Sequence, residues 1–204
     1  MKMTTECGAG KQITGASFSL HPMSSNFIAI IVGVLEEVNT DKVWIKTDDI
    51  TTTIRGKATH VFDVTKAIFV LAAATGEHIA FHATYSVGCP GDSDGDVYLA
   101  ADDIPLNHAK ASKLSSIAGA KFSLYPLGDG DYMELIYKQI EAMKSYVTVS
   151  PAHYSTRLDG DAMDVFKGLE TVFTATAQAG SSHTVMTVSL SANSPTEVGS
   201  DKHA

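Results

Sequence analysis

The hydrophobic residues of this chain follow two spacings, and the two alternate along the sequence. Segments with every second residue apolar are typical of half-buried strands, and apolar residues every three or four positions are typical of amphipathic helices. In the first half, these spacings and the turn residues around them predict strands over residues 16–20, 43–46, 51–55 and 78–87. They predict helices over residues 27–38 and 60–74. The resulting order is βαββαβ.

The second half of the chain repeats this order. The same spacings predict strands over residues 120–124, 146–150, 154–158 and 183–192 and helices over residues 132–144 and 162–177. A short additional helix is expected between the halves, around residues 107–117.

Direct comparison of the halves shows that the chain is a tandem duplication. Residues 17–22 (SFSLHP) recur as residues 121–126 (KFSLYP), and residues 78–90 lie over 183–195. The offset changes from 104 to 105 between these matches, as a small loop insertion would cause. We therefore divide the chain into a first repeat (1–90), a connecting segment (91–118) and a second repeat (119–204).

The order βαββαβ predicts an α+β fold, with two ferredoxin-like units whose antiparallel sheets carry helices on one face. The other face of each sheet is then bare, and a bare sheet face tends to pack against another sheet. Either the two repeats or two chains can provide that packing. We expect a homodimer.

Composition and charge exclude several classes of protein. The chain has 44% hydrophobic residues and a formal net charge of −8, without a basic cluster, so binding to nucleic acid or an anionic membrane is not expected. Its longest apolar runs, residues 27–35 and 67–74, are shorter than the roughly 20 residues that cross a bilayer. With no secretory signal and only two cysteines, we expect a cytoplasmic protein.

Motifs for catalysis or metal binding are not found. The acidic segment 91–96 resembles a calcium loop, but Val97 and Asp103 stand where that loop needs Gly and Glu, so a solvated loop is expected. The histidines and cysteines lack zinc spacing, and no nucleophile elbow, phosphate loop or dinucleotide fingerprint is present. If the protein is instead an enzyme, Cys89 with a nearby histidine is the candidate nucleophile. We expect no metal, no cofactor and no enzymatic activity.

Small polar residues occur on strands that are otherwise apolar. Ser19 and Ser123 lie on the first strand of each repeat, and Thr52 and Thr156 lie on the third. Such hydroxyls either bond to the backbone or face solvent, or they line a pocket for a flat heterocycle that is stacked on an aromatic ring and hydrogen-bonded along one edge.

The chain resembles the YkoF-type proteins that bind thiamin and hydroxymethylpyrimidine. The resemblance covers roughly residues 7–195 and rests on residues 18–23 (FSLHPM), 42–48 (KVWIKTD), 55–56 (RG), 60–63 (HVFD), 88–92 (GCPGD), 158–161 (LDGD) and 190–195 (LSANSP). It implies a homodimer of tandem ferredoxin-like repeats, with a pocket for the aminopyrimidine of thiamin in each repeat. It also implies a cytoplasmic role beside a transporter for thiamin or its pyrimidine precursor.

Ser and Thr hydroxyls both donate and accept, so they suit the ring nitrogens and the amine of an aminopyrimidine. We expect Ser19 with Thr52 in one pocket and Ser123 with Thr156 in the other. Further candidates are Thr47, Asp48, His153 and Tyr154. The halves differ at His21 against Tyr125 and at Arg55 against Asp159. These differences predict two pockets of unequal affinity.

The expected function is therefore non-catalytic binding of thiamin or hydroxymethylpyrimidine, for its uptake or delivery. The alternatives are an enzyme that acts on a small heterocycle through Cys89, or a metabolite-sensing regulatory module, because this fold hosts many activities. Tight binding of a diphosphate is not expected, since phosphate sites usually contain Arg, Lys or a helix N-terminus.

Overall fold

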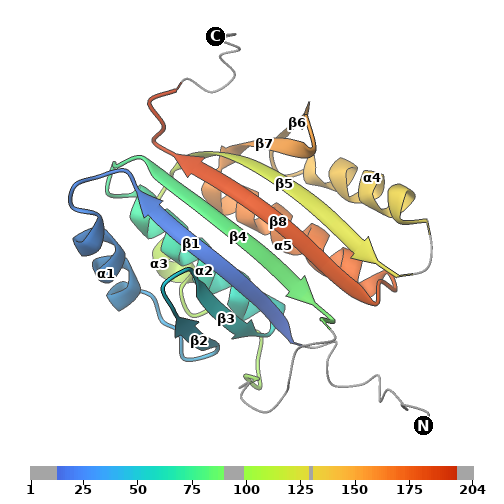
Figure 1. Cartoon of the computed structure of the whole chain (residues 1–204), viewed down its shortest axis with the longest axis horizontal. Helices are drawn as coiled ribbons and strands as arrows, with labels where there is room; N and C mark the ends of the chain where they lie inside the picture. The colour runs from blue at the N-terminus through green and yellow to red at the C-terminus, as the bar shows by residue number, and fades with distance from the viewer. Residues whose placement is uncertain (1–12, 90–98, 129–130, 197–204) are drawn as a thin grey trace.

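The computed structural model describes residues 13–89, 99–128 and 131–196, and these contain one antiparallel sheet of eight strands. The strand order is β2-β3-β1-β4-β8-β5-β7-β6 (Figure 1). The first repeat contains β1 (Thr14–Pro22), α1 (Phe27–Glu37), β2 (Trp44–Thr47), β3 (Thr52–Gly56), α2 (Ala58–Ala73) and β4 (Ile79–Val87). The rest comprises α3 (His108–Ala111), β5 (Ile117–Leu127), α4 (Tyr132–Met143), β6 (Thr148–Ala152), β7 (Ser155–Asp161), α5 (Ala162–Gln178) and β8 (His183–Ala192).

The two repeats join edge to edge through their last strands. β4 and β8 pair antiparallel along their full length, from Ile79 opposite Ala192 to Val87 opposite Thr184. The predicted pair of ferredoxin-like units is confirmed, but the repeats do not cover each other's sheets as two stacked layers. Figure 1 shows α2 and α5 together behind the sheet, and no described helix or strand covers the face turned to the viewer. We call this face the open face.

Both repeats contribute to one hydrophobic core between the sheet and its helices. Phe81 of β4 packs against Phe69 of α2 and Phe166 of α5, with ring centroids 6.0 and 6.3 Å away. Phe62 stacks on Tyr85 at 4.3 Å. Phe62 also lies 5.8 Å from Phe173 of α5. Because aromatic side chains bury much apolar area each, the contacts of Phe81 with Phe166 and of Phe62 with Phe173 stabilise the two repeats as one unit.

The connecting segment is fixed to the first repeat by a buried carboxylate. The Oδ2 atom of Asp63, on α2, accepts hydrogen bonds from the backbone N–H and the side-chain amide of Asn107, at 2.8 and 2.9 Å. The side-chain amide of Asn107 also donates to the carbonyl of Asn39 at 2.9 Å. This anchoring places α3 against α2.

Two predictions about local structure are wrong. The helix expected over 107–117 is only α3, because the chain turns extended after it and Ser116 accepts a backbone hydrogen bond from Ala162. β1 and β5 do not stop before their prolines: Pro22 lies opposite Ile79 as the last residue of β1, and Pro126 lies opposite Thr184 within β5. Proline is tolerated near a strand end because few ladder bonds are lost there. The acidic segment 91–96 lies outside the described residues.

Candidate ligand-binding site

Three of the predicted residues gather where β2 turns into β3. The hydroxyl oxygens of Thr47 and Thr52 are 2.9 Å apart and hydrogen-bonded. The Oδ1 atom of Asp48 accepts hydrogen bonds from the backbone N–H groups of Ile50 and Thr51, both at 2.9 Å. These bonds, from Thr51 and then Ile50, lower the pKa of Asp48. The hairpin end therefore combines a hydroxyl pair with an ionised carboxylate.

Ser19 and Thr52, which we expected in one pocket, lie on opposite faces of the sheet. Thr52 lies opposite Phe18 in the β1–β3 ladder, so its side chain is on the helix-covered side of the sheet with Phe18. Ser19, one residue further, projects from the open face, where it lies opposite His82 of β4. The sheet separates the two hydroxyls.

The second repeat has the same arrangement, so Ser123 and Thr156 are not brought together either. Thr156 lies opposite Phe122 and shares its side of the sheet, while Ser123 projects from the open face. Ser123 donates a hydrogen bond to the backbone carbonyl of Tyr154 at 3.1 Å. Tyr154 itself is fully exposed in the β6–β7 turn with a φ of 63°, and its ring centroid is 6.4 Å from that of His153.

The repeats differ at the position that faces the predicted threonine across the hairpin. In the first repeat, Thr47 lies opposite Thr52. In the second repeat, Pro151 lies opposite Thr156. The first hairpin therefore presents two hydroxyls on the helix side of the sheet, and the second presents one.

Four histidines lie on the open face, each hydrogen-bonded to a serine. His21 bonds to Ser19 at 2.9 Å on β1. The other three pairs join the repeats across the β4–β8 seam, at 2.9 to 3.0 Å: His78 with Ser191, His82 with Ser189, and Ser86 with His183. The sequence analysis named His21 only as a difference between the halves and did not name His82. A spacing of two from Ser19 and from Ala80 places each of them on the open face.

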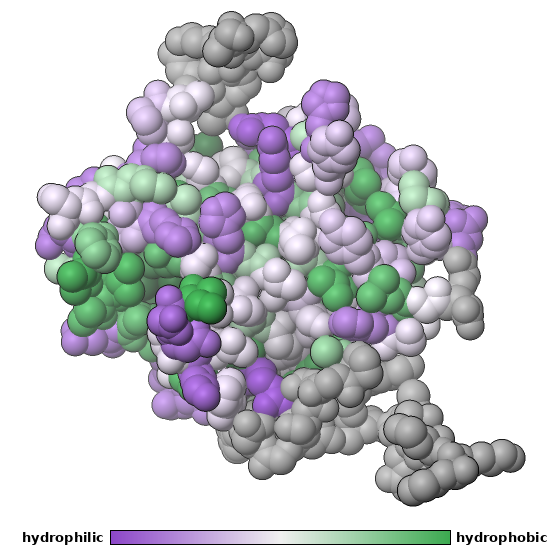
Figure 2. Space-filling model, in the orientation of Figure 1, coloured by the Kyte–Doolittle hydropathy of each residue, from purple (hydrophilic) through white to green (hydrophobic). Residues whose placement is uncertain are grey.

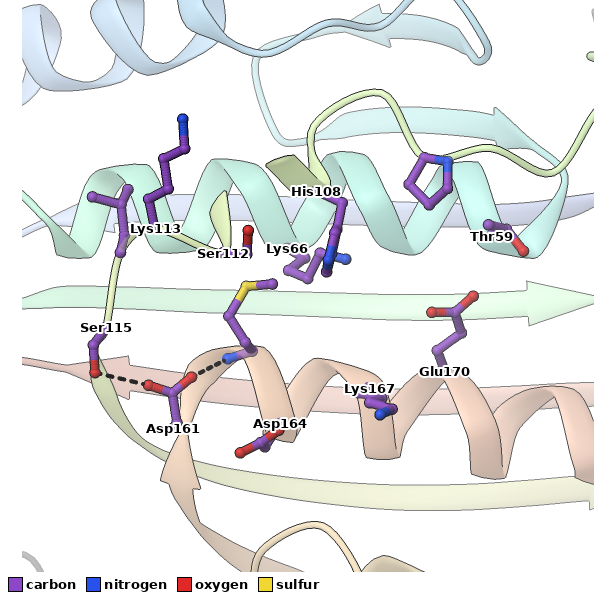
Figure 3. Close-up of a pocket in the computed structure, with 13 residues that line it drawn as sticks. Thr59, Lys66, His108, Ser112, Lys113, Ser115, Asp161, Asp164, Lys167 and Glu170 are labelled. Carbon is purple, nitrogen blue, oxygen red and sulfur yellow. Dashed lines mark hydrogen bonds between the residues drawn. The ribbon is translucent and has the colours of Figure 1, made fainter. Parts of the chain in front are cut away.

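A separate cavity of about 570 Å³ lies between α2, α5 and the connecting segment (Figure 3). Lysines and carboxylates line it together with His108: Lys66, Lys113, Lys167, Asp161, Asp164 and Glu170. Burial raises the pKa of Glu170. Asp161 is already engaged, since it caps α5 at Met163 N and accepts from Ser115 (Figure 3). None of the eight predicted ligand residues lines this cavity, and no local spacing predicted it because its parts are far apart in sequence.

Among the described residues, no group of three or more His, Cys, Asp or Glu side chains is placed to hold a metal ion. Cys89, the residue of the enzyme alternative, is a free, exposed thiol. No helix in the described part of the chain has the length and apolarity that a bilayer span requires.

Comparison with known proteins identifies the family. The model of the YKOF-related family matches residues 13–92 and again residues 117–197. The chain is 46% identical over 190 residues to a Bacillus subtilis (strain 168) protein named "Putative HMP/thiamine-binding protein YkoF". The aligned residues make up 93% of this chain and 94% of the relative. The crystal structure of hypothetical protein MJ1052 from Methanocaldococcus jannascii is similar to part of this chain, with a TM-score of 0.36 and 24% sequence identity. The match covers 40% of this chain and 86% of the MJ1052 chain. On the strength of the two matches to the family model and the identity over nearly the whole chain, the protein belongs to the YkoF-related family.

Proposed function

We propose that this protein binds thiamin or its hydroxymethylpyrimidine moiety without catalysis, with one pocket in each repeat. The observation that carries the proposal is the 46% identity, over almost the full length of both chains, to a protein whose name states HMP and thiamine binding. The duplication supports two pockets, because each repeat places a threonine, Thr52 or Thr156, at the same position on the helix side of the sheet.

The chemistry of the first hairpin suits an aminopyrimidine. Thr47 and Thr52 together offer donors and acceptors for ring nitrogens and an exocyclic amine. Ile45, which is 37% exposed, projects from the same side of β2 as these hydroxyls and offers an apolar surface for a flat ring. The ionised Asp48 favours the cationic thiazolium of intact thiamin. We assign the ligand to this side of the sheet, which leaves Ser19 and Ser123 outside the pockets.

The two pockets are unequal in this proposal. In the second repeat, Pro151 stands opposite Thr156 where the first repeat has Thr47 opposite Thr52. The second hairpin therefore offers the ligand one threonine hydroxyl, that of Thr156. His153 and Tyr154 lie beside Thr156 at the β6–β7 turn and supply aromatic and polar groups there. Since each missing hydrogen bond to a ligand lowers affinity, the first repeat is the tighter site.

Calorimetry with thiamin, thiamin diphosphate and hydroxymethylpyrimidine tests this function. Thr52→Val and Thr156→Val nearly preserve side-chain shape, and each is expected to weaken one of two binding events by about tenfold. Thr53→Val is the matched control, because Thr53 lies next to Thr52 but projects from the open face opposite Ser17. If both variants bind like wild type, the site assignment is wrong. If wild type binds none of the three compounds, the function is wrong.

The same samples distinguish a binder from an enzyme. Mass spectrometry of thiamin or hydroxymethylpyrimidine after incubation is expected to recover the compound unchanged. Turnover that is lost in Cys89→Ser, with binding retained, would support the enzyme alternative instead.

We also propose that two copies pair through the open face and that the dimer works in the cytoplasm, delivering its ligand from a thiamin-precursor transporter. At its centre the open face carries small side chains, such as Ser17, Thr84 and Thr187, and these allow a second sheet to approach to about 10 Å. Thr187→Arg, at the centre of that face, is expected to give monomers in sedimentation velocity. Thr171→Arg, on the exposed side of α5, is the control. A dimer that survives Thr187→Arg would exclude this interface.

A further inference from the structure

The cavity between the repeats has walls that the duplication does not copy. α2 of the first repeat and α5 of the second form two walls, and the connecting segment forms the third (Figure 3). Since the connecting segment occurs once in the chain, the cavity is a single site and not a third version of the hairpin pockets. Its volume of about 570 Å³ lies within the range of roughly 300–1,000 Å³ that small-molecule sites occupy.

The connecting segment is tied down on both sides of this cavity. At one end, Asn107 bonds to the buried carboxylate of Asp63 on α2. At the other end, the hydroxyl of Ser115 donates a hydrogen bond to Asp161, the N-cap of α5, at 3.0 Å. The cavity is therefore preformed, and preformed walls favour affinity because they need not be ordered when a ligand binds.

Lys66 brings a largely buried positive charge into the cavity from α2. Its side chain is only 11% exposed, and its ammonium lies 3.7 Å from Oδ1 of Asp63, which is too long for a hydrogen bond. Asp63 itself does not line the cavity. In the described part of the chain, no lysine that lines the cavity forms an ion pair with a carboxylate that lines it. The ammonium of Lys66 therefore retains donors for another acceptor.

Glu170 brings the opposite charge into the cavity, reaching from α5 towards α2 (Figure 3). Burial raises the pKa of its carboxyl because the charged form is poorly solvated there, while the charge of Lys66 and a hydrogen bond from Thr59 act in the opposite direction. A ligand ammonium group beside Glu170 would replace the lost solvation with a charge-assisted hydrogen bond.

The rest of the lining completes the description of a ligand. Pro105, Leu114 and Met163 contribute apolar surface. A ligand with a single charge would be attracted by either Lys66 or Glu170 and repelled by the other, whereas a ligand with both charges is attracted by the pair. Four other ionisable lining residues are exposed to solvent, where their charges are screened: His108, Lys113, Asp164 and Lys167.

We propose that this cavity binds an α-amino acid with an apolar side chain. The carboxylate of the amino acid accepts from Lys66, its ammonium group donates to Glu170, and its side chain contacts Leu114 and Met163. The site is separate from the proposed thiamin pockets, which lie at the hairpins. The open face, which Figure 2 shows, is on the other side of the sheet from α2 and α5, so a second chain packed there leaves the cavity accessible.

Calorimetry of the full chain with L-leucine, L-methionine and L-phenylalanine tests this proposal. Wild type is expected to bind at least one of them. The N-acetyl derivative of that amino acid lacks the positive charge, and its amide lacks the negative charge. Each derivative is expected to bind about tenfold more weakly or worse, because it loses a charge-assisted hydrogen bond.

Two variants locate the binding. Glu170→Gln, which keeps the shape of the side chain and removes its charge, is expected to weaken amino-acid binding by about tenfold or more. Glu141→Gln, on the exposed side of α4, is its matched control. Ser112→Phe is expected to fill the cavity and block binding, with Ser145→Phe, outside the cavity, as its control. Unchanged far-ultraviolet circular dichroism would show that each variant is folded.

Several outcomes would overturn the proposal. Binding of none of the three amino acids by wild type would exclude this class of ligand. Equal binding of the N-acetyl derivative would make the cavity an anion site, and equal binding of the amide would make it a cation site. Unchanged binding in Glu170→Gln and Ser112→Phe, or equal losses in their controls, would place the amino acid elsewhere. Competition between thiamin and the amino acid would show that the cavity is not a separate site.

Discussion

Thr47 and Thr52 lie opposite each other at the end of the β2–β3 hairpin, with their hydroxyl oxygens 2.9 Å apart. In the second repeat the same relationship joins Pro151 to Thr156. The duplication thus preserves the threonine on the inner strand and changes the residue on the edge strand. This difference has a direct consequence for ligand affinity.

Pro151→Thr is expected to strengthen thiamin binding at the second site by about three- to tenfold, because it restores a hydroxyl beside Thr156. Thr47→Val is expected to weaken the first site by a similar factor. Calorimetry that resolves both sites would check these changes, with Thr53→Val as the control on the open face. An affinity that changes at the other site, or at neither, would contradict the assignment of the hairpins to the pockets.

Removal of the amide of Asn107 is expected to destabilise the fold. Asn107→Leu removes the side-chain amide bond to the buried Oδ2 atom of Asp63 and leaves only the backbone N–H of residue 107 to donate to it. Loss of a hydrogen bond to a buried carboxylate costs about 1–3 kcal/mol. Urea unfolding would measure the loss. Asn26→Leu, at the exposed N-cap of α1 where the side chain makes no capping bond, is expected to cost much less. Equal losses in the two variants would show that the contact with Asp63 is unimportant.

Stability is expected to fall with rising pH in the alkaline range because of Tyr85. Burial raises the pKa of this phenol above its ordinary value of 10.0. Above that value the unfolded chain loses the proton while the folded chain keeps it, so the stabilisation is complete below pH 10.0 and is lost above it. Thermal unfolding between pH 8 and pH 11 would show a shallower decline in Tyr85→Phe. The variant also removes the hydrogen bond to Thr65, at a cost of about 1 kcal/mol near neutral pH.

Glu170 is expected to destabilise the protein at neutral pH. Burial raises its pKa above the ordinary value of 4.5, so the folded chain holds this proton more tightly and loses stability as the pH rises through the raised pKa. Glu170→Gln, which has no charge to bury, should therefore raise the unfolding temperature at pH 7. The gain should disappear below pH 4.5, where both states are protonated. Glu141→Gln, on the exposed side of α4, is the control. A gain that is the same at both pH values would exclude burial of charge as its cause.

Much of this architecture follows from the sequence. The spacing of apolar residues predicted all eight strands and the four long helices, with ends that differ from the structure by a few residues. The offset of 104 to 105 revealed the duplication, because both copies must place the same apolar residues towards one core. The hydroxyls of Thr52 and Thr156 were also found at equivalent positions.

Tertiary structure decided which of these residues share a side of the sheet. Side chains alternate along a strand, so a shift of one residue between β1 and β3 would exchange the positions of Thr52 and Thr53. The pairing of Phe18 with Thr52 places Thr52 on the helix side of the sheet and leaves Ser19 on the open face. The join of the repeats through β4 and β8 was equally undetermined, because strands pair through backbone groups that all residues other than proline have in common. The sequence by itself determined the repeated βαββαβ unit and its candidate hydroxyls, and only the packed sheet determined which hydroxyls meet.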